Sequence, residues 1–422
     1  MKTIVLIGAG KSATVLIDYL IAETEANNWK FIIADSNREQ ILLKTKNSGF
    51  AEAIQLDITN EEQRGQLIQR AHVVISMMPP ALHFLVAKDC VEYRKHLLTA
   101  SYLDDKIKSL KDEISNRKLL FICEMGLDPG IDHMSAMKII NEIKAAGGQI
   151  RSFKSHCGGL VAPESDNNPW HYKISWNPRN IVMAGQSGAV YKEDNVTKTI
   201  SYQNLFDCSN EIVYDGLKHL AFYPNRDSLG YIPTYKLPDT ATFLRTTLRH
   251  VDFFKGWNAI VHAGLTNDVD EIDVNGLTFS AWSKPVLPFV QEENRSMLEF
   301  LGLFSESPVP ASAKTSADIL QYLLEIKLKM EPADKDMIVM LHEFEYELGG
   351  QSKTLQSCLV VRGEDSLRTA MAKTVGLPLG IAAKLILNGK ITLRGLHIPT
   401  VKEIYLPVLE ELEKSGIVFV EN

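Results

Sequence analysis

The stretch TIVLIGAGKSATVL, residues 3–16, decides the fold of the first part of the chain. A run of apolar residues precedes Gly8, Gly10 and Ala13, which have the spacing G-x-G-x-x-A, and an amphipathic stretch follows them. This order predicts a strand, a tight turn and a helix. The first glycine permits the turn, the second lets the backbone approach a pyrophosphate, and the small third residue lets helix and strand pack closely. The N-terminus of the helix would then present unpaired N–H groups to the phosphates.

The alternation of strand and helix continues through the first 125 residues. Five further short apolar runs follow, with helical periodicity between them. They read FIIAD, AIQLDI, HVVISMM, HLLTAS and LLFICE. Their apolar residues are continuous instead of alternating, as expected for strands that are covered on both faces. We therefore predict an α/β domain with six strands in a doubly wound parallel sheet.

Bulk composition limits the class of protein. With 422 residues, of which 45% are hydrophobic and 23% charged, the chain has the composition of a globular protein with at least two domains. The net charge of −7 argues against nucleic-acid binding, which needs a basic face. We see no signal peptide and no apolar run of the roughly 18 to 20 residues that span a bilayer. We therefore expect neither a membrane nor a nucleic acid as partner.

The cysteines indicate a reducing compartment and no metal centre. There are five of them, and none has zinc-ligand spacing to another cysteine or to a histidine. They are Cys90, Cys123, Cys157, Cys208 and Cys358. We expect reduced thiols in a soluble cytoplasmic protein.

The second part of the chain has a different pattern. Residues 133–250 carry one helical stretch and then aromatic, turn-rich sequence typical of strands with long loops. Residues 250–335 have apolar positions three and four apart, which predicts a helical insertion. The runs DMIVMLHEFEYEL and LQSCLVVRG then predict a pair of strands, and a long helical stretch with Gly-Leu-Pro inside it follows them.

Residues after the predicted strands indicate which cofactor the loop binds. Asp35 closes the second strand, where a carboxylate can accept hydrogen bonds from both ribose hydroxyls, and this favours NAD. Arg38 lies three residues on and could instead pair with the 2′-phosphate of NADP, so NADP stays open. A role for Asp35 as a cap of the next helix is compatible with either cofactor. The carboxyl ends of the other strands face the same crevice. The further residues predicted to contact the cofactor are Lys11, Ser12, Ser36, Asp57, Ile58, Ser76, Met77, Ala100, Ser101, Leu127 and Asp128.

Six motifs are spread along the chain in a fixed order. They are ASYL (100–103), EMGLDPGIDHM (124–134), SHCGGLVAPESDNNPWHYKISW (155–176), YPNRDS (223–228), FLRTTLRH (243–250) and AMAKTVGLPLGIAAK (370–384). Together they resemble the saccharopine dehydrogenase family of the glutamate-forming type. The likeness is to the fungal saccharopine reductases and to the C-terminal half of the animal and plant aminoadipic semialdehyde synthases, and it covers nearly the whole chain. Three residues depart from the family pattern. His156 stands where tyrosine is usual, Val161 replaces a proline, and Thr246 replaces a glycine.

The resemblance implies a fold and a reaction. The fold is a variant Rossmann domain, residues 1–130, completed by 390–422, with a mixed-sheet catalytic domain, 131–250 and 336–389, and a helical insertion domain, 251–335. In the implied reaction of lysine metabolism, a nicotinamide cofactor oxidises the secondary amine of saccharopine, and water splits the imine into glutamate and 2-aminoadipate 6-semialdehyde.

The resemblance also implies site residues. Saccharopine carries three carboxylates, and arginine suits them because its planar fork binds a carboxylate bidentately. Arg226 and Arg249 match the family's substrate-binding positions, with Thr247 beside them. The positions that line the crevice between nicotinamide and substrate are matched by Ser101, Tyr102 and Asp128, and Trp176 matches a tryptophan that contacts the cofactor.

The acid–base group stays open among several residues. The catalytic positions are assigned to Asp128, Tyr102 and Cys157, although a buried cysteine is as often a small hydrophobe as a reactive thiol. His133 and Glu124 are also candidates, and the substrate amine itself could titrate. Asp132 is expected to cap the helix that follows the motif at 124–134.

Two other functions compete with the dehydrogenase. A carboxyspermidine-type dehydrogenase shares this architecture, but its diamine substrate would need acidic residues in place of Arg226 and Arg249. A nucleotide-binding sensor without catalysis is disfavoured by the polar residues retained at the crevice positions. A homodimer is the default expectation for a globular enzyme of this kind.

Overall fold

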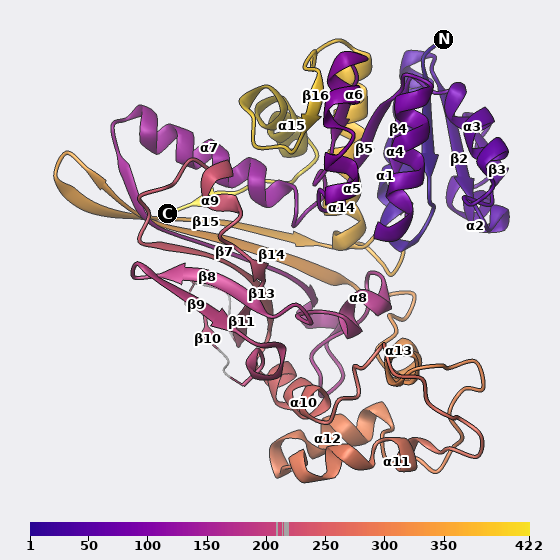
Figure 1. Ribbon diagram of the computed structural model, residues 1–422, viewed down its shortest axis with the longest axis vertical. Helices are drawn as coiled ribbons and strands as arrows, with labels where there is room; N and C mark the ends of the chain where they lie inside the picture. Colours follow the sequence, from indigo (N-terminus) through magenta and orange to yellow (C-terminus); the bar gives the residue numbers. More distant parts are fainter. Residues whose placement is uncertain (208–209, 213, 215–218) are drawn as a thin grey trace. The chain divides into compact units, whose positions relative to one another are not determined.

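The computed structural model describes residues 1–207, 210–212, 214 and 219–422, so Cys208 lies outside the described residues. The chain divides into two compact units (Figure 1). The first comprises Met1–Gly147 and Leu367–Phe419, and the second comprises Gly148–Ser366 and Val420–Asn422. The four described cysteines, Cys90, Cys123, Cys157 and Cys358, are buried and free of disulfides.

The first unit contains a seven-stranded parallel sheet, which confirms the predicted fold class. Its strand order is β16-β6-β5-β4-β1-β2-β3. The strands are β1 (Thr3–Ile7), β2 (Lys30–Asp35), β3 (Ala51–Gln55), β4 (Val73–Ser76), β5 (His96–Thr99), β6 (Leu120–Ile122) and β16 (Gly395–His397). The order reverses at β1, so the crevice between β1 and β4 is the topological switch point where such sheets bind ligands. The C-terminal segment adds β16 in parallel to β6.

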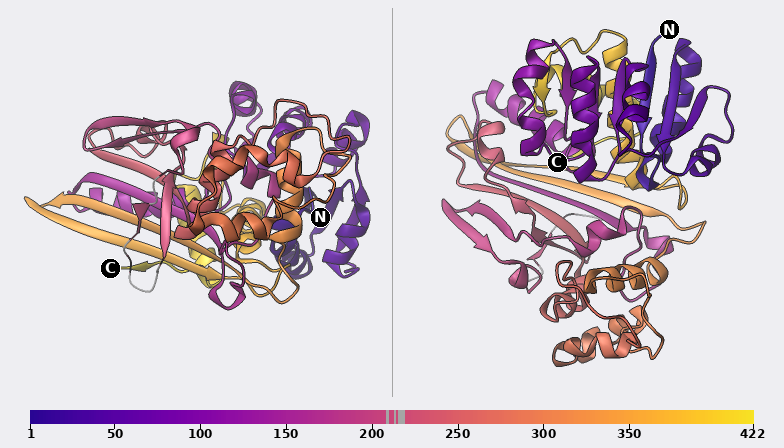
Figure 2. Two further views of the ribbon diagram at one scale, coloured as in Figure 1. Left: turned by 90° about the horizontal axis from the view of Figure 1, so that it is seen from below. Right: turned by 45° about the vertical axis from the view of Figure 1, so that its right-hand side comes forward.

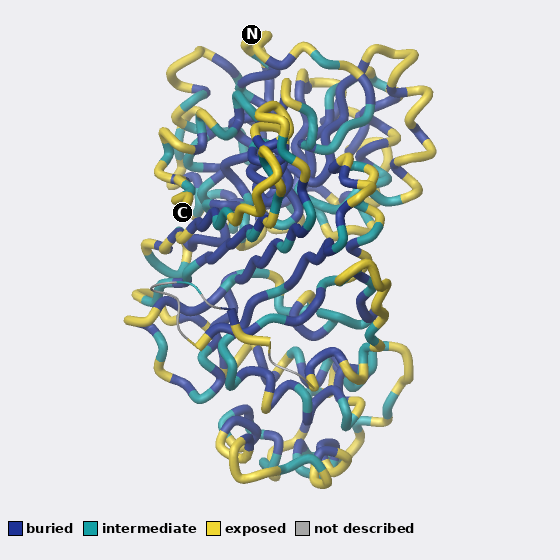
Figure 3. Tube along the Cα trace, turned by 90° about the vertical axis from the view of Figure 1, so that its left-hand side faces the viewer, coloured by how far each residue is buried: buried dark blue, intermediate teal, exposed yellow. Residues whose placement is uncertain are grey.

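Helices connect these strands and cover the sheet. They are η1 (Lys11–Ala13), α1 (Thr14–Asn27), α2 (Arg38–Thr45), α3 (Glu61–Gln69), η2 (Pro80–Leu82), α4 (His83–Glu92), α5 (Asp105–Lys108), α6 (Lys111–Asn116), α7 (Ile131–Ala145), α14 (Ala370–Leu387) and α15 (Lys402–Lys414). Several begin at a side-chain cap: Asn37 accepts from the N–H of Gln40, and Asn60 accepts from the N–H of Gln63. Every residue of β1 is buried, as its uninterrupted apolar run predicted. Figure 3 shows the buried stretches of the chain in dark blue and the exposed ones in yellow.

The division into units differs from the expected boundaries at three places. Residues 131–147 and 367–389 were expected in the catalytic domain, but both belong to the first unit. Val420–Asn422 were expected in the Rossmann domain, but they belong to the second unit. Helix α14 packs on α1, where a Cβ on Gly376 would lie 2.9 Å from Cβ of Leu16. By length and composition α14 could cross a membrane, yet 78% of it is buried. This close helix contact makes α14 a core helix of the first unit.

The second unit is built on a mixed sheet. Its main strand order is β10-β11-β13-β7-β14-β15-β17, with β8, β9 and β12 paired off this path. The strands are β7 (Gln149–Val161), β8 (Ala189–Glu193), β9 (Val196–Ile200), β10 (Asn210–Glu211), β11 (Leu220–Pro224), β12 (Arg226–Asp227), β13 (Thr242–His250), β14 (Asp336–Leu348), β15 (Gln351–Arg362) and β17 (Val420–Glu421). The predicted pair β14 and β15 is an antiparallel hairpin, drawn in Figure 2 as two long orange strands. Gly349 and Gly350 both have positive φ at its turn, as a two-residue loop of type I′ requires.

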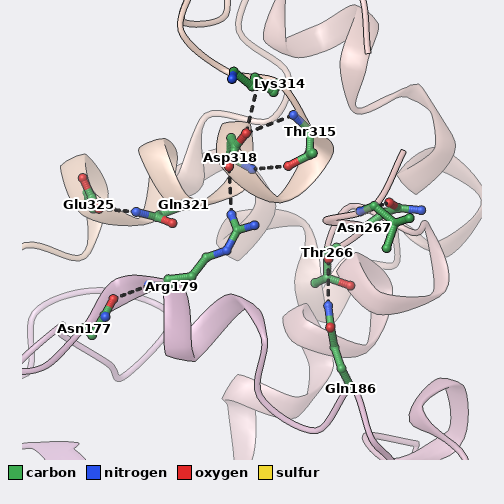
Figure 4. Close-up of polar contacts among 11 residues, drawn as sticks. Asn177, Arg179, Gln186, Thr266, Asn267, Lys314, Thr315, Asp318, Gln321 and Glu325 are labelled. Atoms are coloured by element: carbon green, nitrogen blue, oxygen red, sulfur yellow. Dashed lines mark hydrogen bonds and ion pairs between the residues drawn. The ribbon is translucent and has the colours of Figure 1, made fainter. Parts of the chain in front are cut away.

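Residues 251–335 are helical as predicted, but they share one hydrophobic core with the sheet of the second unit. The short and long helices of this unit are η3 (Pro163–Ser165), α8 (Pro178–Val182), η4 (Tyr202–Asn204), α9 (Tyr231–Thr234), α10 (Val251–His262), α11 (Phe279–Trp282), η5 (Lys284–Phe289), α12 (Glu292–Leu301) and α13 (Ser316–Lys327). One core cluster includes Tyr223 of β11 and Trp257 of α10. Figure 4 shows how Arg179 of α8 donates to Asp318 of α13 at 2.9 Å, while Asp318 forms a capping box with Thr315.

Candidate functional site

The glycine loop after β1 has the conformation that the sequence predicted. Gly8 has φ +101°, and a Cβ on it would lie 2.8 Å from the carbonyl oxygen of Met77 at the end of β4. A Cβ on Gly10 would meet nothing within 4 Å, so the backbone there is open to an approaching ligand. Ala13 is fully buried, and its N–H donates to the Gly10 carbonyl at 3.0 Å. The loop therefore offers the close backbone approach that a pyrophosphate needs.

A hollow of about 340 Å³ lies at the carboxyl ends of β1, β2 and β3. Four of its lining residues were predicted from the sequence as cofactor contacts: Asp35, Ser36, Asp57 and Ile58. The others are Ile7, Ala34, Gln55, Leu56, Met78 and Leu82. Apolar walls with a few polar groups, and this volume, suit the adenosine part of a dinucleotide. The residues present thus fit the expected cofactor.

The two carboxylates of the hollow are held by backbone N–H groups. Oδ2 of Asp35 accepts from Ala9 N–H at 2.7 Å, and Oδ1 accepts from Asn37 N–H at 3.0 Å. Oδ1 of Asp57 accepts from the backbone and the hydroxyl of Thr59, at 2.9 and 2.7 Å, and these bonds lower the pKa of the Asp57 carboxyl. Asn37, not Asp35, is the residue that caps α2.

Sequence reasoning missed Lys44, which lies in the last turn of α2. Its ammonium donates to the carbonyl oxygen of Gly10 in the glycine loop. Burial lowers the pKa of Lys44 to about 8, although the carboxylates of Asp35 and Asp18 act in the opposite direction. Arg38, in the first turn of the same helix, is exposed, and its Nε donates to the Ala53 carbonyl at 3.2 Å. Two cations of α2 therefore lie beside the predicted cofactor residues.

The ends of β4 and β5 bring a second group of predicted residues together. Ser76 ends β4, Met77 donates its N–H to Ile7 at 2.8 Å, and Ala100 and Ser101 follow β5. Ser76 and Ser101 both contact the imidazole of His83, a residue that sequence reasoning missed. Its position in PPALHF, among turn residues, gave no signal of this contact.

The motif EMGLDPGIDHM forms a buried turn between β6 and α7. Gly130 has φ +148°, and a Cβ on it would lie 2.1 Å from the Gly126 carbonyl oxygen, so only glycine fits there. The hydroxyl of Tyr102 donates to Oδ1 of Asp128 at 3.4 Å, which brings two predicted residues together. Asp132 does not cap α7 as expected. Gly130 is the N-cap residue, and Asp132 instead accepts its N–H at 2.6 Å, because the tight turn points the side chain back into the loop.

Glu124 and His133, two acid–base candidates, contact each other inside this turn. Oε2 of Glu124 lies 2.8 Å from Nε2 of His133, and Oε1 accepts from the N–H of Leu103 at 3.0 Å. His133 is fully buried and Glu124 is 4% exposed. These contacts hold the segment that carries Leu127 and Asp128, so a structural role explains them.

In the second unit, β13 presents a row of polar side chains on one face. Side chains alternate along a strand, so Arg245, Thr247 and Arg249 point to the same side. Thr247 lies beside Cys157 of β7 and Tyr223 of β11 in the strand register. Cys157 is 6% exposed. Sequence reasoning missed Arg245, although the spacing R-x-T-x-R within a strand would have predicted it. Its guanidinium lies 4.5 Å from the ring of Tyr231.

Arg249 is a buried cation that lacks an anionic partner among the described residues. It is 4% exposed, and its Nη1 donates to the carbonyl of Leu248 at 2.8 Å. The guanidinium carbon lies 5.2 Å from the Tyr172 ring and 5.6 Å from the Phe253 ring. Its Nε has no hydrogen-bond partner within the described part of the chain. A buried guanidinium with an unsatisfied donor is costly, and a carboxylate ligand would satisfy it.

The other two predicted residues of the second unit are Trp176, in the loop before α8, and Arg226, on β12. Trp176 donates its Nε1–H to the hydroxyl of Tyr172 at 3.0 Å, so it is linked through Tyr172 to Arg249. Arg226 is exposed on β12, a strand that pairs with β8, and has φ +51°.

Two of the three departures from the family pattern contact each other. Nδ1 of His156 lies 2.8 Å from Oγ1 of Thr246, and its Nε2 lies 3.1 Å from Oε2 of Glu343. The hydrogen bond to His156 lowers the pKa of the Glu343 carboxyl. Val161, the third departure, pairs with Asp336 at the end of β7.

The second unit also contains a histidine and aspartate group that could hold a metal ion: His171, His250 and Asp252. Nδ1 of His171 lies 2.6 Å from Asp166, its Nε2 lies 3.5 Å from Asp252, and its ring stacks on that of His250 at 3.9 Å. Nδ1 of His250 already accepts the N–H of Asp252, and Asp252 also pairs with Lys255 at 2.7 Å. Ion pairs and a helix cap account for these contacts.

Comparison with known proteins identifies the family. A model described as Saccharopine dehydrogenase C-terminal domain matches residues 126–417, and one described as Saccharopine dehydrogenase NADP binding domain matches residues 4–122. The chain belongs to the saccharopine dehydrogenase family. The resemblance inferred from the six motifs is thereby confirmed.

Relatives in the saccharopine dehydrogenase family cover the whole chain. It is 32% identical to Saccharopine dehydrogenase [NADP(+), L-glutamate-forming] of Saccharomyces cerevisiae, over 100% of this chain and 99% of that protein. It is 35% identical to Alpha-aminoadipic semialdehyde synthase of Arabidopsis thaliana, over 88% of this chain, and to the mitochondrial enzyme of that name from Mus musculus, over 99%. The chain spans only 38% and 47% of these two synthases.

Solved structures agree with the family assignment. The apo, histidine-tagged saccharopine dehydrogenase (L-Glu forming) of Saccharomyces cerevisiae superposes with a TM-score of 0.89 at 32% identity, covering 100% of this chain and 99% of that one. The homospermidine synthase of Legionella pneumophila, in complex with NAD, has a TM-score of 0.60 at 9% identity, covering 100% and 91%. The second likeness concerns the fold alone. The preference for NAD drawn from Asp35 is not confirmed, because the family model and the yeast relative both name NADP.

Proposed function

We propose that this protein is a glutamate-forming saccharopine dehydrogenase. It would oxidise the secondary amine of saccharopine, and water would then split the imine into glutamate and 2-aminoadipate 6-semialdehyde. The observation that carries the proposal is the buried guanidinium of Arg249, whose Nε–H lacks a protein acceptor among the described residues. A carboxylate of the substrate would supply this acceptor. The choice of substrate is supported by the 32% identity to the yeast enzyme of this name, which extends over 100% of this chain.

Residues of both units have roles in this proposal. Arg249 binds one substrate carboxylate, Thr247 on the same strand face donates its hydroxyl to it, and Arg226 binds another carboxylate. Asp128 accepts a hydrogen bond from the substrate's nitrogen and holds the reacting carbon for hydride transfer, a positioning effect that can supply several kcal/mol. Tyr102 donates to Asp128 and keeps that carboxylate oriented.

The dinucleotide, when bound, accepts the hydride. The glycine loop and Asp35 bind its pyrophosphate and ribose, and the hollow lined by Ile58 excludes water from the adenine. We propose NADP as the preferred cofactor, because Arg38 and Lys44 supply cations near the ribose end while Asp35 shares its charge with two backbone N–H groups.

A soluble cytoplasmic location agrees with the buried free thiols, and a homodimer stays a prediction from symmetry alone.

The carboxyspermidine-type reaction is disfavoured, because its diamine substrate would place a second amine against the cation of Arg249. A sensor without catalysis would not need this buried charge.

The test is an absorbance assay at the nicotinamide band with saccharopine and either NADP or NAD. Saccharopine should give steady reduction of the cofactor, with a higher kcat/KM for NADP. Formation of glutamate and aldehyde in equal amounts would confirm the products. Turnover of a diamine with an aldehyde but not of saccharopine would replace this function by the carboxyspermidine-type reaction.

A further inference from the structure

The imidazole of His83 bridges two serine hydroxyls at the ends of adjacent strands. Its Nδ1 lies 2.8 Å from Oγ of Ser76, and its Nε2 lies 2.6 Å from Oγ of Ser101. Strands β4 and β5 run in parallel with Ser76 opposite Thr99, so Ser101 follows two residues beyond that pair. His83 begins α4, which places its ring between the two strand ends. All of these residues belong to the first unit.

Burial keeps this imidazole neutral. His83 is 2% exposed, and desolvation lowers the pKa of its ring to about 4, against the opposite effect of Asp104. A neutral imidazole carries one N–H and one acceptor nitrogen. The two serine hydroxyls lie closest to the ring, and Oγ1 of Thr99 lies further off, at 3.5 Å from each ring nitrogen. With one serine close to each nitrogen, one serine donates to the ring and the other accepts from it.

The surroundings of Ser76 decide which serine donates. Ser76 is fully buried, and within the described residues its hydroxyl contacts only Nδ1 of His83. Its hydrogen therefore goes to Nδ1, since a buried hydroxyl without an acceptor is unfavourable. The ring hydrogen is then on Nε2 and goes to Oγ of Ser101.

The same reasoning fixes the free hydrogen of Ser101. Its oxygen accepts from His83, so its own hydrogen is not used on the ring and is available to another acceptor. Its backbone N–H donates to Oγ1 of Thr99 at 3.2 Å, which holds the residue in place. Ser76, His83 and Ser101 thus form a directed chain of hydrogen bonds that ends in the hydroxyl hydrogen of Ser101.

We propose that His83 is a positioning residue that makes the Ser101 hydroxyl a hydrogen-bond donor to a ligand oxygen. This rests on the proposed function. The acceptor is a carboxylate oxygen of the substrate or the carboxamide oxygen of the nicotinamide. The chain positions rather than relays protons, because its far end, Ser76, is buried and passes its hydrogen to His83 alone within the described residues.

The first experiment reads the tautomer directly and does not depend on activity. In protein labelled with ¹⁵N-histidine, the ring resonances of His83 are assigned by their loss in His83→Gln. The proposal expects the hydrogen on Nε2 and a ring that stays neutral at pH 7. A hydrogen on Nδ1, or an imidazolium at pH 7, would overturn it whatever the enzyme turns over.

The second experiment separates positioning from structural support. His83→Leu and Ser101→Ala should each lower kcat/KM about tenfold, the effect of one hydrogen bond. The double variant should be no worse than Ser101→Ala alone, because His83 acts through Ser101. His83→Gln keeps an N–H donor and should recover part of the loss. A full second loss in the double variant, or unchanged kinetics in His83→Leu, would contradict the proposal.

The individual constants identify the acceptor. A rise in the KM of saccharopine with unchanged cofactor KM assigns the Ser101 hydrogen to a substrate carboxylate, and the reverse assigns it to the carboxamide. If the wild-type protein does not turn over saccharopine, the proposed function is wrong. The tautomer measurement then still tests the hydrogen-bond chain, because it does not depend on activity.

Discussion

The backbone N–H of Ala9 donates to Oδ2 of Asp35 at 2.7 Å, so the glycine loop and the end of β2 are held together by one carboxylate. The other oxygen of Asp35 accepts from Asn37 at 3.0 Å. An aspartate at this position is usually interpreted as a ribose ligand that excludes a 2′-phosphate. In this protein Asp35 also joins the glycine loop to the end of β2 through its hydrogen bonds. This structural role explains why the presence of the aspartate alone did not identify the cofactor.

Substitution of Asp35 and Arg38 should affect cofactor binding differently. Asp35→Ala removes the bond to Ala9, so the affinities for NADP and NAD should both fall, by about tenfold or more. Arg38→Ala removes only a cation beside the ribose, so NADP should bind about tenfold more weakly while NAD is unchanged. Dissociation constants from fluorescence titration provide the measurement. Equal losses for both cofactors in Arg38→Ala would contradict a role for Arg38 in phosphate binding.

Cofactor affinity should depend on pH through Lys44. Burial lowers the pKa of Lys44 to about 8, so the free protein loses this charge as the pH rises through that value. A bound phosphate favours the protonated form and raises the pKa, so binding takes up a proton above pH 8. The affinity for NADP should therefore fall as the pH rises through about 8. Lys44→Met should bind more weakly and lose this dependence; if it keeps the wild-type pH profile, another group titrates.

Replacement of Arg249 should separate binding from stability. Arg249→Met removes the carboxylate ligand, so the KM of saccharopine should rise by the equivalent of about 2–5 kcal/mol. The thermal midpoint should change little or rise, since Met removes a buried charge whose Nε has no partner among the described residues. Arg249→Lys keeps the charge without the planar fork and should be intermediate in KM. A large drop in the midpoint together with a normal KM would make Arg249 purely structural.

Asp128 and Tyr102 should contribute unequally to turnover. Asp128→Ala removes the group that positions the substrate nitrogen, so kcat should fall at least about a hundredfold. The bond from Tyr102 to Asp128 is long, at 3.4 Å, so Tyr102→Phe should cost less than about tenfold. Rates are compared in proteins whose circular dichroism is unchanged. Near-normal turnover by folded Asp128→Ala would exclude Asp128 from catalysis.

The sequence predicted those features that depend on chain-local patterns. The strands of the first sheet are continuous apolar runs. Residues at or just after their carboxyl ends, such as Asp35, Asp57 and Ser101, must lie at one edge of a parallel sheet. Lys44 and His83 could not be found this way, because each acts through the direction in which a helical side chain points. A polar residue on a surface helix has the same sequence pattern whether it faces solvent or a glycine loop.

Domain boundaries were harder to predict for a related reason. Helix α14 follows the strands of the second unit in the chain, and its apolar composition does not say which sheet it covers. The glycines that let it approach α1, Gly376 and Gly380, have meaning only once Leu16 and Tyr19 are known to lie opposite. Local periodicity does not predict long-range packing of this kind.

The buried ion pair between Arg64 and Asp89 should support both stability and cofactor binding. Nε of Arg64 lies 2.7 Å from Oδ2 of Asp89, with both side chains less than a tenth exposed, and Nη1 donates to the Ile58 carbonyl at 2.7 Å. Arg64→Ala leaves a buried carboxylate unpaired, which should cost about 3–5 kcal/mol. Because Ile58 lines the hollow, NADP should also bind more weakly.

Urea denaturation monitored by far-ultraviolet circular dichroism measures this effect. Because the chain has two units, the free energy of unfolding is compared for the transition of the first unit, which contains Arg64 and Asp89. The matched control is the double variant Arg64→Met with Asp89→Leu, which removes both charges and should regain most of the lost stability. It should not regain cofactor affinity, since the bond to the Ile58 carbonyl is still missing. Recovery of both quantities would show that Arg64 acts only as a counter-charge to Asp89 and has no part in shaping the hollow.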